Sequence, residues 1–113
     1  MAESSIMATL MGVIAERKAK ASSESSYVAG LMKEGTAAIC AKIIEEAAEV
    51  VEASDEPGDA GRDNLVKEVA DLVFHTAVLL GHRDIGWDAV EDELRRRFGT
   101  SGLVEKALRP PKS

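Results

Sequence analysis

The sequence is short of the residues that mark several common classes of small protein. Cys40 is the only cysteine among 113 residues, so neither an internal disulfide nor a thiolate metal site is expected. Aromatic residues make up only 4% of the chain, and no segment alternates polar and apolar residues as a β-strand does. The apolar run at residues 6–14 is too short to cross a bilayer, and it precedes its basic residues instead of following them, unlike a signal peptide. We therefore expect a cytoplasmic protein without strands.

The abundant residues favour helices. Ala, Leu, Val, Glu and Lys dominate a composition with 45% hydrophobic and 30% charged residues, which is ordinary for a globular domain. A chain of this length corresponds to one domain with a single core. Because so small a domain buries a modest share of its surface, we also expect it to gain core by self-association.

Negative charge is concentrated in one segment. The formal net charge is -6, but residues 45–71 hold ten acidic and two basic side chains, so this segment carries -8 and the remainder +2. Such a surface repels nucleic acid and anionic membranes, unless a metal ion or the basic ends of the chain intervene. We therefore expect neither nucleic acid nor a membrane as a partner.

Helical periodicity and helix start and stop signals predict an all-α bundle of four to five helices. Ser26 and Thr36 are expected to cap two helices and Gly35 and Gly81 to end two, which leaves His82 exposed beyond a helix end. The predicted helices cover residues 6–20, 27–34, 37–53, 63 or 64 to about 80, and about 87–98.

The remaining segments predict one loop and one tail. Residues 54–63 combine a proline, two glycines and four acids, which is typical of a loop. Residues 1–98 are interpreted as a single all-α domain, and residues 99–113 as a C-terminal tail that is partly helical around residues 103–108 and otherwise frayed.

Glutamates crowd the third predicted helix. In KIIEEAAEVVEA, residues 42–53, a projection at about 100° per residue places Glu45, Glu49 and Glu52 in a stripe of roughly 60°, with Glu46 at its margin. Apolar side chains, Ile44 and Val51 among them, cover the opposite side. On this helix alone, a solvated acidic face is the simpler interpretation.

The fourth predicted helix changes that interpretation. LVKEVADLVFHTAVLL, residues 65–80, is apolar nearly all round, as in a helix buried on every side, yet Glu68, Asp71 and His75 form one polar stripe. A buried carboxylate must be protonated, paired or metal-bound. The only nearby cation, Lys67, is expected to point elsewhere.

Two helices that flank one loop can pack antiparallel, so the two acidic stripes are expected to face each other. Five or six carboxylates in one cleft make a site for a hard divalent cation such as Mg²⁺, which takes oxygen ligands. The ion relieves the repulsion among the glutamates. A metal cluster held by carboxylates alone also needs a strongly anionic ligand to bridge it, and a polyphosphate fits.

These motifs carry a resemblance to a known family. EEAAE, residues 45–49, followed by EVAD, residues 68–71, resembles the E-E-x-x-E and E-x-x-D signature of the MazG-like all-α NTP pyrophosphatases. The segments SSYVAGLMKEG, ADLVFHTAVLL and WDAVEDELRRR further resemble the phosphoribosyl-ATP pyrophosphohydrolases of histidine biosynthesis. The similarity spans about residues 6–98.

The resemblance implies hydrolysis of phosphoribosyl-ATP to phosphoribosyl-AMP and pyrophosphate, the second step of L-histidine biosynthesis, with Mg²⁺, for which Mn²⁺ can substitute. It implies the metal ligands Glu46, Glu49, Glu68 and Asp71. Glu45 is then either a further ligand or the base that orients the attacking water. The resemblance also implies a homodimer whose second chain can complete the cleft.

Several other side chains have two interpretations each. Lys33 and Lys42 either steady phosphate charge or are plain exposed lysines. Tyr27 either stacks on a base or closes the pocket, or it belongs to the core. His75 either contacts a ligand carboxylate or the substrate, or it is a satisfied core histidine. The arginines at 95–97 either meet phosphate or suit the dipole at the end of their helix.

Two further functions stay open on the sequence. One is a housekeeping pyrophosphatase that acts on dUTP or damaged dNTPs through the same metal site. The other is a non-catalytic helical module that binds a partner protein. Turnover of phosphoribosyl-ATP against a panel of dNTPs separates the two enzymes, and the module predicts no turnover at all.

Overall fold

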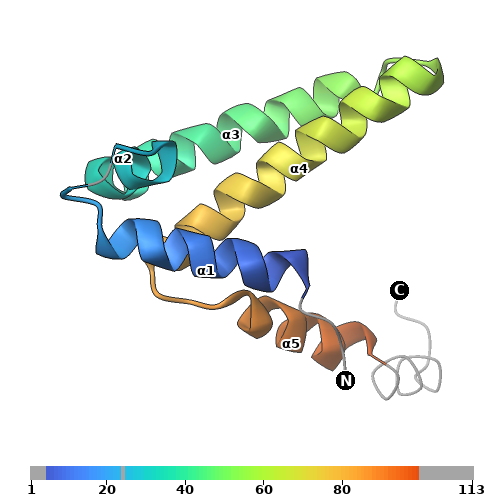
Figure 1. Cartoon of the computed structure of the whole chain (residues 1–113). Coiled ribbons are helices and arrows are strands. Elements are labelled where there is room, and N and C mark those ends of the chain that lie inside the picture. The colour runs from blue at the N-terminus through green and yellow to red at the C-terminus, as the bar shows by residue number, and fades with distance from the viewer. Residues whose placement is uncertain (1–4, 24, 100–113) are drawn as a thin grey trace.

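The regular structure is entirely helical in the computed structural model, which describes residues 5–23 and 25–99 (Figure 1). In chain order the helices are α1 (Ile6–Ala19), α2 (Tyr27–Glu34), α3 (Thr36–Ala53), α4 (Gly58–His82) and α5 (Trp87–Phe98). Five helices and no strand over these ranges confirm the predicted all-α class. The turn predicted at residues 103–108 lies outside the described residues.

A long antiparallel hairpin of α3 and α4 is the backbone of the fold. In Figure 1 these two helices lie side by side, α1 packs against the C-terminal part of α4, and α5 lies beside α1. The core forms at the end of the hairpin that is opposite the α3–α4 loop. It consists of Ile14, Val28, Leu31, Met32, Ile39, Ala77 and Val78.

The short helix α2 has the predicted boundaries. The hydroxyl of Ser26 accepts a hydrogen bond from the backbone N–H of Ala29 at 3.1 Å, so Ser26 caps α2. Gly35 follows with a φ of 95°, a conformation that suits glycine because it has no Cβ. Thr36 was expected to cap α3, but it is the first residue of that helix because Gly35 holds the cap position.

Helix α4 begins earlier than predicted. It starts at Gly58, so only residues 54–57 connect it to α3, and the expected loop at 54–63 is wrong. Pro57 adopts an extended conformation just before the helix, and Asp59 lies in the first turn. An acid in the first turn stabilises a helix start, and a proline just before the helix is compatible with it, so the residues that indicated a loop are also compatible with a helix N-terminus.

Helix α4 also continues through Gly81, which was expected to end it. A Cβ at position 81 would overlap the Cγ2 atom of Ile14, so the glycine lets α1 approach α4 closely. His82 is the last residue of the helix and is half-buried, which corrects its expected exposure. Packing against α1, and not helix termination, therefore explains the glycine.

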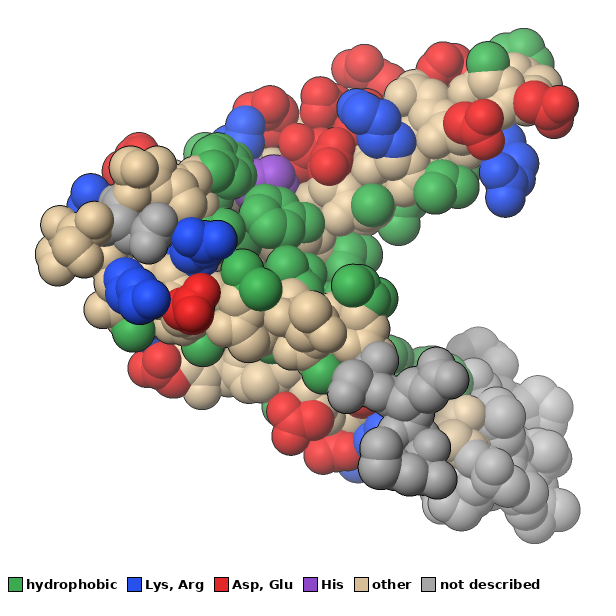
Figure 2. Space-filling view, in the orientation of Figure 1, with side chains coloured by type: hydrophobic (Ala, Val, Ile, Leu, Met, Phe, Trp, Pro, Cys, Tyr) green, Lys and Arg blue, Asp and Glu red, His purple; other side chains and the backbone are tan. Residues whose placement is uncertain are grey.

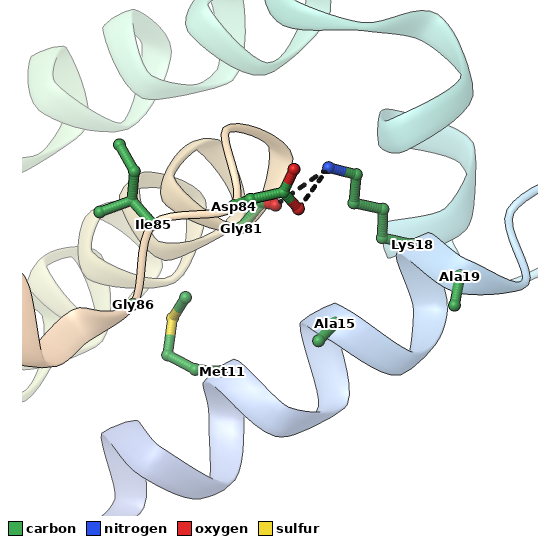
Figure 3. Close-up of a pocket in the computed structure, with 8 residues that line it drawn as sticks. All are labelled: Met11, Ala15, Lys18, Ala19, Gly81, Asp84, Ile85 and Gly86. Atoms are coloured by element: carbon green, nitrogen blue, oxygen red, sulfur yellow. Dashed lines mark hydrogen bonds and ion pairs between the residues drawn. The ribbon is translucent and has the colours of Figure 1, made fainter.

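Lys18 of α1 closes the C-terminal end of α4. Its ammonium group donates to the carbonyl of His82 at 2.9 Å. It also pairs with Asp84 at 2.8 Å (Figure 3). The hydrogen bond from Lys18 lowers the pKa of Asp84. A hollow of about 590 Å³ lies beside this pair. It is lined by Met11, Ala15, Lys18, Ala19, Gly81, Asp84, Ile85 and Gly86, and therefore by none of the predicted site residues.

The outer part of the hairpin is not covered within one chain. Val66 and Val69 of α4 are 56% and 41% exposed, so the expectation that this helix is buried on every side is wrong. On α3, Ile44 and Val51 are exposed as well. The physical reason is that α1 and α2 reach only the end of the hairpin where the core lies. No described helix is long and apolar enough to span a membrane.

Candidate active site

The antiparallel hairpin brings the two acidic stripes together. Acidic side chains gather along one face of the α3–α4 hairpin in Figure 2. The acidic residues form two groups of three. Within each group, every residue offers a carboxylate oxygen that lies within 4.8 Å of those of the other two. One group consists of Glu45, Glu46 and Glu49, and the other of Glu46, Glu68 and Asp71. Glu46 belongs to both groups, so it joins the α3 carboxylates to those of α4. We call these five residues the carboxylate centre.

The members of the carboxylate centre differ in how deeply they are buried. Glu46 is only 7% exposed, and the side chain of Glu68 is 13% exposed. Asp71 and Glu45 lie further out, with 42% and 55% of their side chains exposed. The helical projection placed Glu46 at the margin of the acidic stripe, but the packing of α4 makes it the innermost carboxylate.

Glu46 is a buried carboxylate in electrostatically unfavourable surroundings. Burial, followed by the charges of Glu49, Asp71 and Glu68, raises its pKa. Its Oε2 atom is buried and has no hydrogen-bond partner among the described residues. A buried carboxylate oxygen without a partner is costly, and a divalent cation would both bind it and offset the repulsion from its neighbours. The residues present therefore fit a hard metal ion.

Two lysines border the carboxylate centre. The ammonium of Lys67 lies 3.9 Å from Glu68 and 4.0 Å from Asp71, so the expectation that it points elsewhere is wrong. These pairs are long and the lysine is 69% exposed, which makes them weak. Lys42 lies 3.4 Å from both carboxylate oxygens of Glu45. Among the described residues these lysines form ion pairs with Glu45, Glu68 and Asp71 and none with Glu46, so the buried carboxylate still lacks a cation.

An aromatic group links α2 to the carboxylate centre. The Tyr27 hydroxyl lies 2.7 Å from Nε2 of His75, and Nδ1 of His75 lies 2.9 Å from the carbonyl oxygen of Asp71. Phe74 packs edge-on against His75 and stacks with Tyr27. Sequence analysis did not single out Phe74, because its place in an apolar run gives no signal of its own. Burial raises the pKa of Tyr27, and the charges of Glu45, Glu46 and Asp71 act in the same direction while Lys42 opposes them.

The other basic residues considered for phosphate binding are Lys33 and the arginines of α5, and none of them forms an ion pair with the carboxylate centre within the described residues. Lys33 is exposed in the last turn of α2, and its ammonium group forms no ion pair with any residue that the structure describes. The arginines 95–97 pair with Glu91, Asp92 and Glu93 of their own helix. Hydrogen bonds from Arg96 and Arg97 lower the pKa of Glu93 to about 2. These arginines are thus held within α5.

Comparison with known proteins identifies the family. A family model described as phosphoribosyl-ATP pyrophosphohydrolase matches residues 7–98. The phosphoribosyl-ATP pyrophosphatase of Rhodopirellula baltica is 50% identical over 107 residues, which cover 95% of this chain and 85% of the relative. Those of Geobacter metallireducens and Neisseria meningitidis serogroup B are 52% and 50% identical over 106 and 105 residues. They cover 93% of this chain in each case, and 93% and 94% of the relatives.

A helical hairpin that holds clustered carboxylates, together with these relatives, defines the class as an all-α hydrolase of phosphoanhydrides. Within that class, the chain belongs to the phosphoribosyl-ATP pyrophosphohydrolase family.

Proposed function

We propose that this protein hydrolyses phosphoribosyl-ATP to phosphoribosyl-AMP and pyrophosphate, the second step of L-histidine biosynthesis. Family membership over residues 7–98 supports the substrate. The observation that carries the chemistry is the buried oxygen of Glu46, which has no hydrogen-bond partner in the part of the chain that the structure describes and lies where the two carboxylate groups meet. Such a site accepts a cation, and a cation in turn attracts a polyphosphate.

Mg²⁺ is the proposed cofactor, with Mn²⁺ as a substitute. Glu46, Glu49, Glu68 and Asp71 would hold it, since their oxygens come from both helices and converge on Glu46. When bound, the ion supplies charge neutralisation to the phosphoanhydride and its pyrophosphate leaving group.

The chain's own groups supply the remaining steps. Glu45 is the most exposed member of the carboxylate centre and lies next to Glu46 on α3. We assign it the role of orienting the attacking water and accepting its proton, while Lys42 holds its carboxylate from 3.4 Å. Lys42 also offers positive charge to the substrate's phosphates, and Lys33 is proposed for the outer part of the same substrate. Tyr27 is proposed for substrate binding, and His75, whose Nε2 lies 2.7 Å from the Tyr27 hydroxyl, is proposed to act through it.

The assembly is proposed to be a cytoplasmic homodimer that binds no nucleic acid. Exposed apolar side chains on the hairpin, including Ile44, Val51 and Val66, support it. Covering such side chains with another chain would remove apolar surface from water, which stabilises the assembly. Residues 1–98 are proposed as the catalytic domain, in agreement with the matched range, and residues 99–113 as a tail.

A turnover assay with matched variants tests the function. Wild-type protein with Mg²⁺ should release pyrophosphate and phosphoribosyl-AMP from phosphoribosyl-ATP, and do so faster than from dUTP or other dNTPs. Glu49→Gln and Asp71→Asn should each lose most of this turnover, at least about 100-fold, because each removes a charge from the metal site.

Glu52→Gln is the matched control, because Glu52 lies on α3 but belongs to neither carboxylate group. It should keep near wild-type turnover. Preference for a dNTP would replace the proposed substrate by that of a housekeeping pyrophosphatase. Equal absence of turnover in wild type and variants would favour the non-catalytic module.

A further inference from the structure

We propose that Tyr27 binds the sugar of the substrate by accepting a hydrogen bond from a ribose hydroxyl, and that His75 is the positioning residue that restricts the phenol oxygen to this accepting role. The inference rests on the proposed function and deepens it, since it names the group of the substrate that Tyr27 recognises.

The first step concerns His75, whose two ring nitrogens are both engaged. The carbonyl oxygen of Asp71 can only accept a hydrogen bond, so Nδ1, at 2.9 Å from it, must carry a hydrogen and donate. A neutral imidazole with its proton on Nδ1 has only a lone pair on Nε2. The side chain is 5% exposed and its nitrogens are occupied within the protein, so His75 does not contact the substrate itself.

The second step concerns the hydroxyl of Tyr27. With His75 neutral, Nε2 accepts and the phenol donates its single proton across the 2.7 Å contact. The phenol oxygen then has no proton left and can only accept a hydrogen bond from any further group. Tyr27 is 52% exposed, so ligands can reach its ring and oxygen.

The third step concerns the place of Tyr27 in the site. Its hydroxyl contacts His75, and His75 in turn bonds to the backbone carbonyl of Asp71, a member of the carboxylate centre. A substrate whose phosphates occupy the carboxylate centre therefore brings its neighbouring atoms to Tyr27. Phosphate oxygens cannot donate to an accepting phenol, whereas the nearest donors in a nucleoside triphosphate are the hydroxyls of the ribose that carries the phosphates. That ribose is the chemical match for Tyr27.

Steady-state kinetics of Tyr27→Phe provide the main test. Removing the hydroxyl keeps the ring that stacks with Phe74. Loss of one neutral hydrogen bond should raise KM for phosphoribosyl-ATP about three- to tenfold and leave kcat within about twofold. Analogues that lack the 2′ or 3′ hydroxyl of that ribose identify the partner. With one of these analogues, the KM of the wild type should rise by the same factor, whereas the KM of Tyr27→Phe should not rise further.

Variants of His75 test its positioning role. His75→Leu leaves Tyr27 without its acceptor and should raise KM as Tyr27→Phe does. In His75→Gln the amide oxygen can accept from Tyr27 and should restore most of the affinity. Thr76→Val is the control, because within the described residues the Thr76 hydroxyl bonds only to the Leu72 carbonyl of its own helix, and its KM should stay at the wild-type value.

An unchanged KM in Tyr27→Phe would overturn the inference. So would analogues that raise the KM of Tyr27→Phe by the same factor as they raise that of the wild type. Calorimetric binding of phosphoribosyl-AMP gives a second readout that needs no turnover, with the same expected loss of affinity in Tyr27→Phe. A wild type that turns over phosphoribosyl-ATP with no effect of Tyr27→Phe refutes the inference alone. A wild type without turnover refutes the proposed function and, with it, the inference.

Discussion

At the scale of single residues, Glu46 links stability to function. It is a buried carboxylate whose neighbours are Glu49, Glu68 and Asp71, and one of its oxygens has no hydrogen-bond partner in the described part of the chain. In the metal-free protein this arrangement is unfavourable, because like charges repel and burial removes the water that would screen them. With a bound cation, the same carboxylates contribute favourably to the free energy of unfolding. The residue is thus expected to destabilise the empty site and stabilise the loaded one.

Glu46→Gln should separate these two effects. Without divalent ions, the variant should be more stable by about 1 kcal/mol, since it removes three like-charge contacts worth a few tenths of a kcal/mol each. That corresponds to a rise of roughly 4 to 8 °C in Tm for a domain of this size. With Mg²⁺ at 100 times its Kd, the wild type should gain about 2.7 kcal/mol by linkage, and the variant should gain much less. Thermal unfolding with and without Mg²⁺ measures both.

The control for this experiment is again Glu52→Gln, which should respond to Mg²⁺ as the wild type does. Equal stabilisation of wild type and Glu46→Gln by Mg²⁺ would show that the ion binds elsewhere. In that case, metal binding would not explain why Glu46 is buried.

At the scale of elements, the contact between α1 and α4 positions the end of the hairpin that holds the core. Ile14 is fully buried and faces Gly81, where any side chain would overlap it. Lys18, one helical turn further along α1, holds the last carbonyl of α4. His75 lies on the same helix α4, between this contact and the carboxylate centre. Close packing at Gly81 therefore helps to fix the register of the helix that carries His75, Asp71 and Glu68.

Gly81→Ala tests whether close approach or helix propensity dominates at this position. Alanine favours a helix by about 1 kcal/mol over glycine, but the overlap with Ile14 should cost about 1 to 3 kcal/mol. We expect net destabilisation in urea unfolding. Gly12→Ala is the matched control, since Gly12 lies within α1 and a Cβ there meets no atom within 4 Å. Stabilisation by both substitutions alike would contradict the packing argument.

At the scale of the whole molecule, the hairpin extends beyond the helices that cover it. Apolar side chains line the side of the hairpin that faces α1 in Figure 2, and part of this surface is open to solvent. The carboxylates occupy another face of the same two helices. A second chain that covers the apolar surface would therefore stabilise the hairpin and with it the carboxylate centre.

Sedimentation equilibrium tests the proposed homodimer. The wild type should sediment with about twice the 12.0 kDa mass of the chain. Val66→Glu places a charge on the exposed part of the hairpin and should shift the equilibrium towards the monomer by at least about tenfold in Kd, because an unpaired charge in an apolar contact is costly. Val13→Glu makes the same change on α1, at a side chain that is also exposed, and should leave the mass unchanged. A monomeric wild type would contradict the proposed assembly.

The sequence by itself determined the helical class, the caps at Ser26 and Gly35, and the presence of acidic stripes on two consecutive helices. These features depend on periodicity and on local hydrogen bonding, which a chain carries in any surroundings. The residues of the loop at 54–63 were ambiguous, because proline and acids favour both turns and helix starts.

Only the tertiary structure decided which carboxylate is innermost, how His75 is engaged and why Gly81 is a glycine. Each of these depends on what a second helix places against the first: α4 covers Glu46, Tyr27 of α2 meets His75, and Ile14 of α1 fills the space at Gly81. A helical projection describes the faces of one helix, whereas burial and hydrogen-bond partners depend on the neighbour that each face meets.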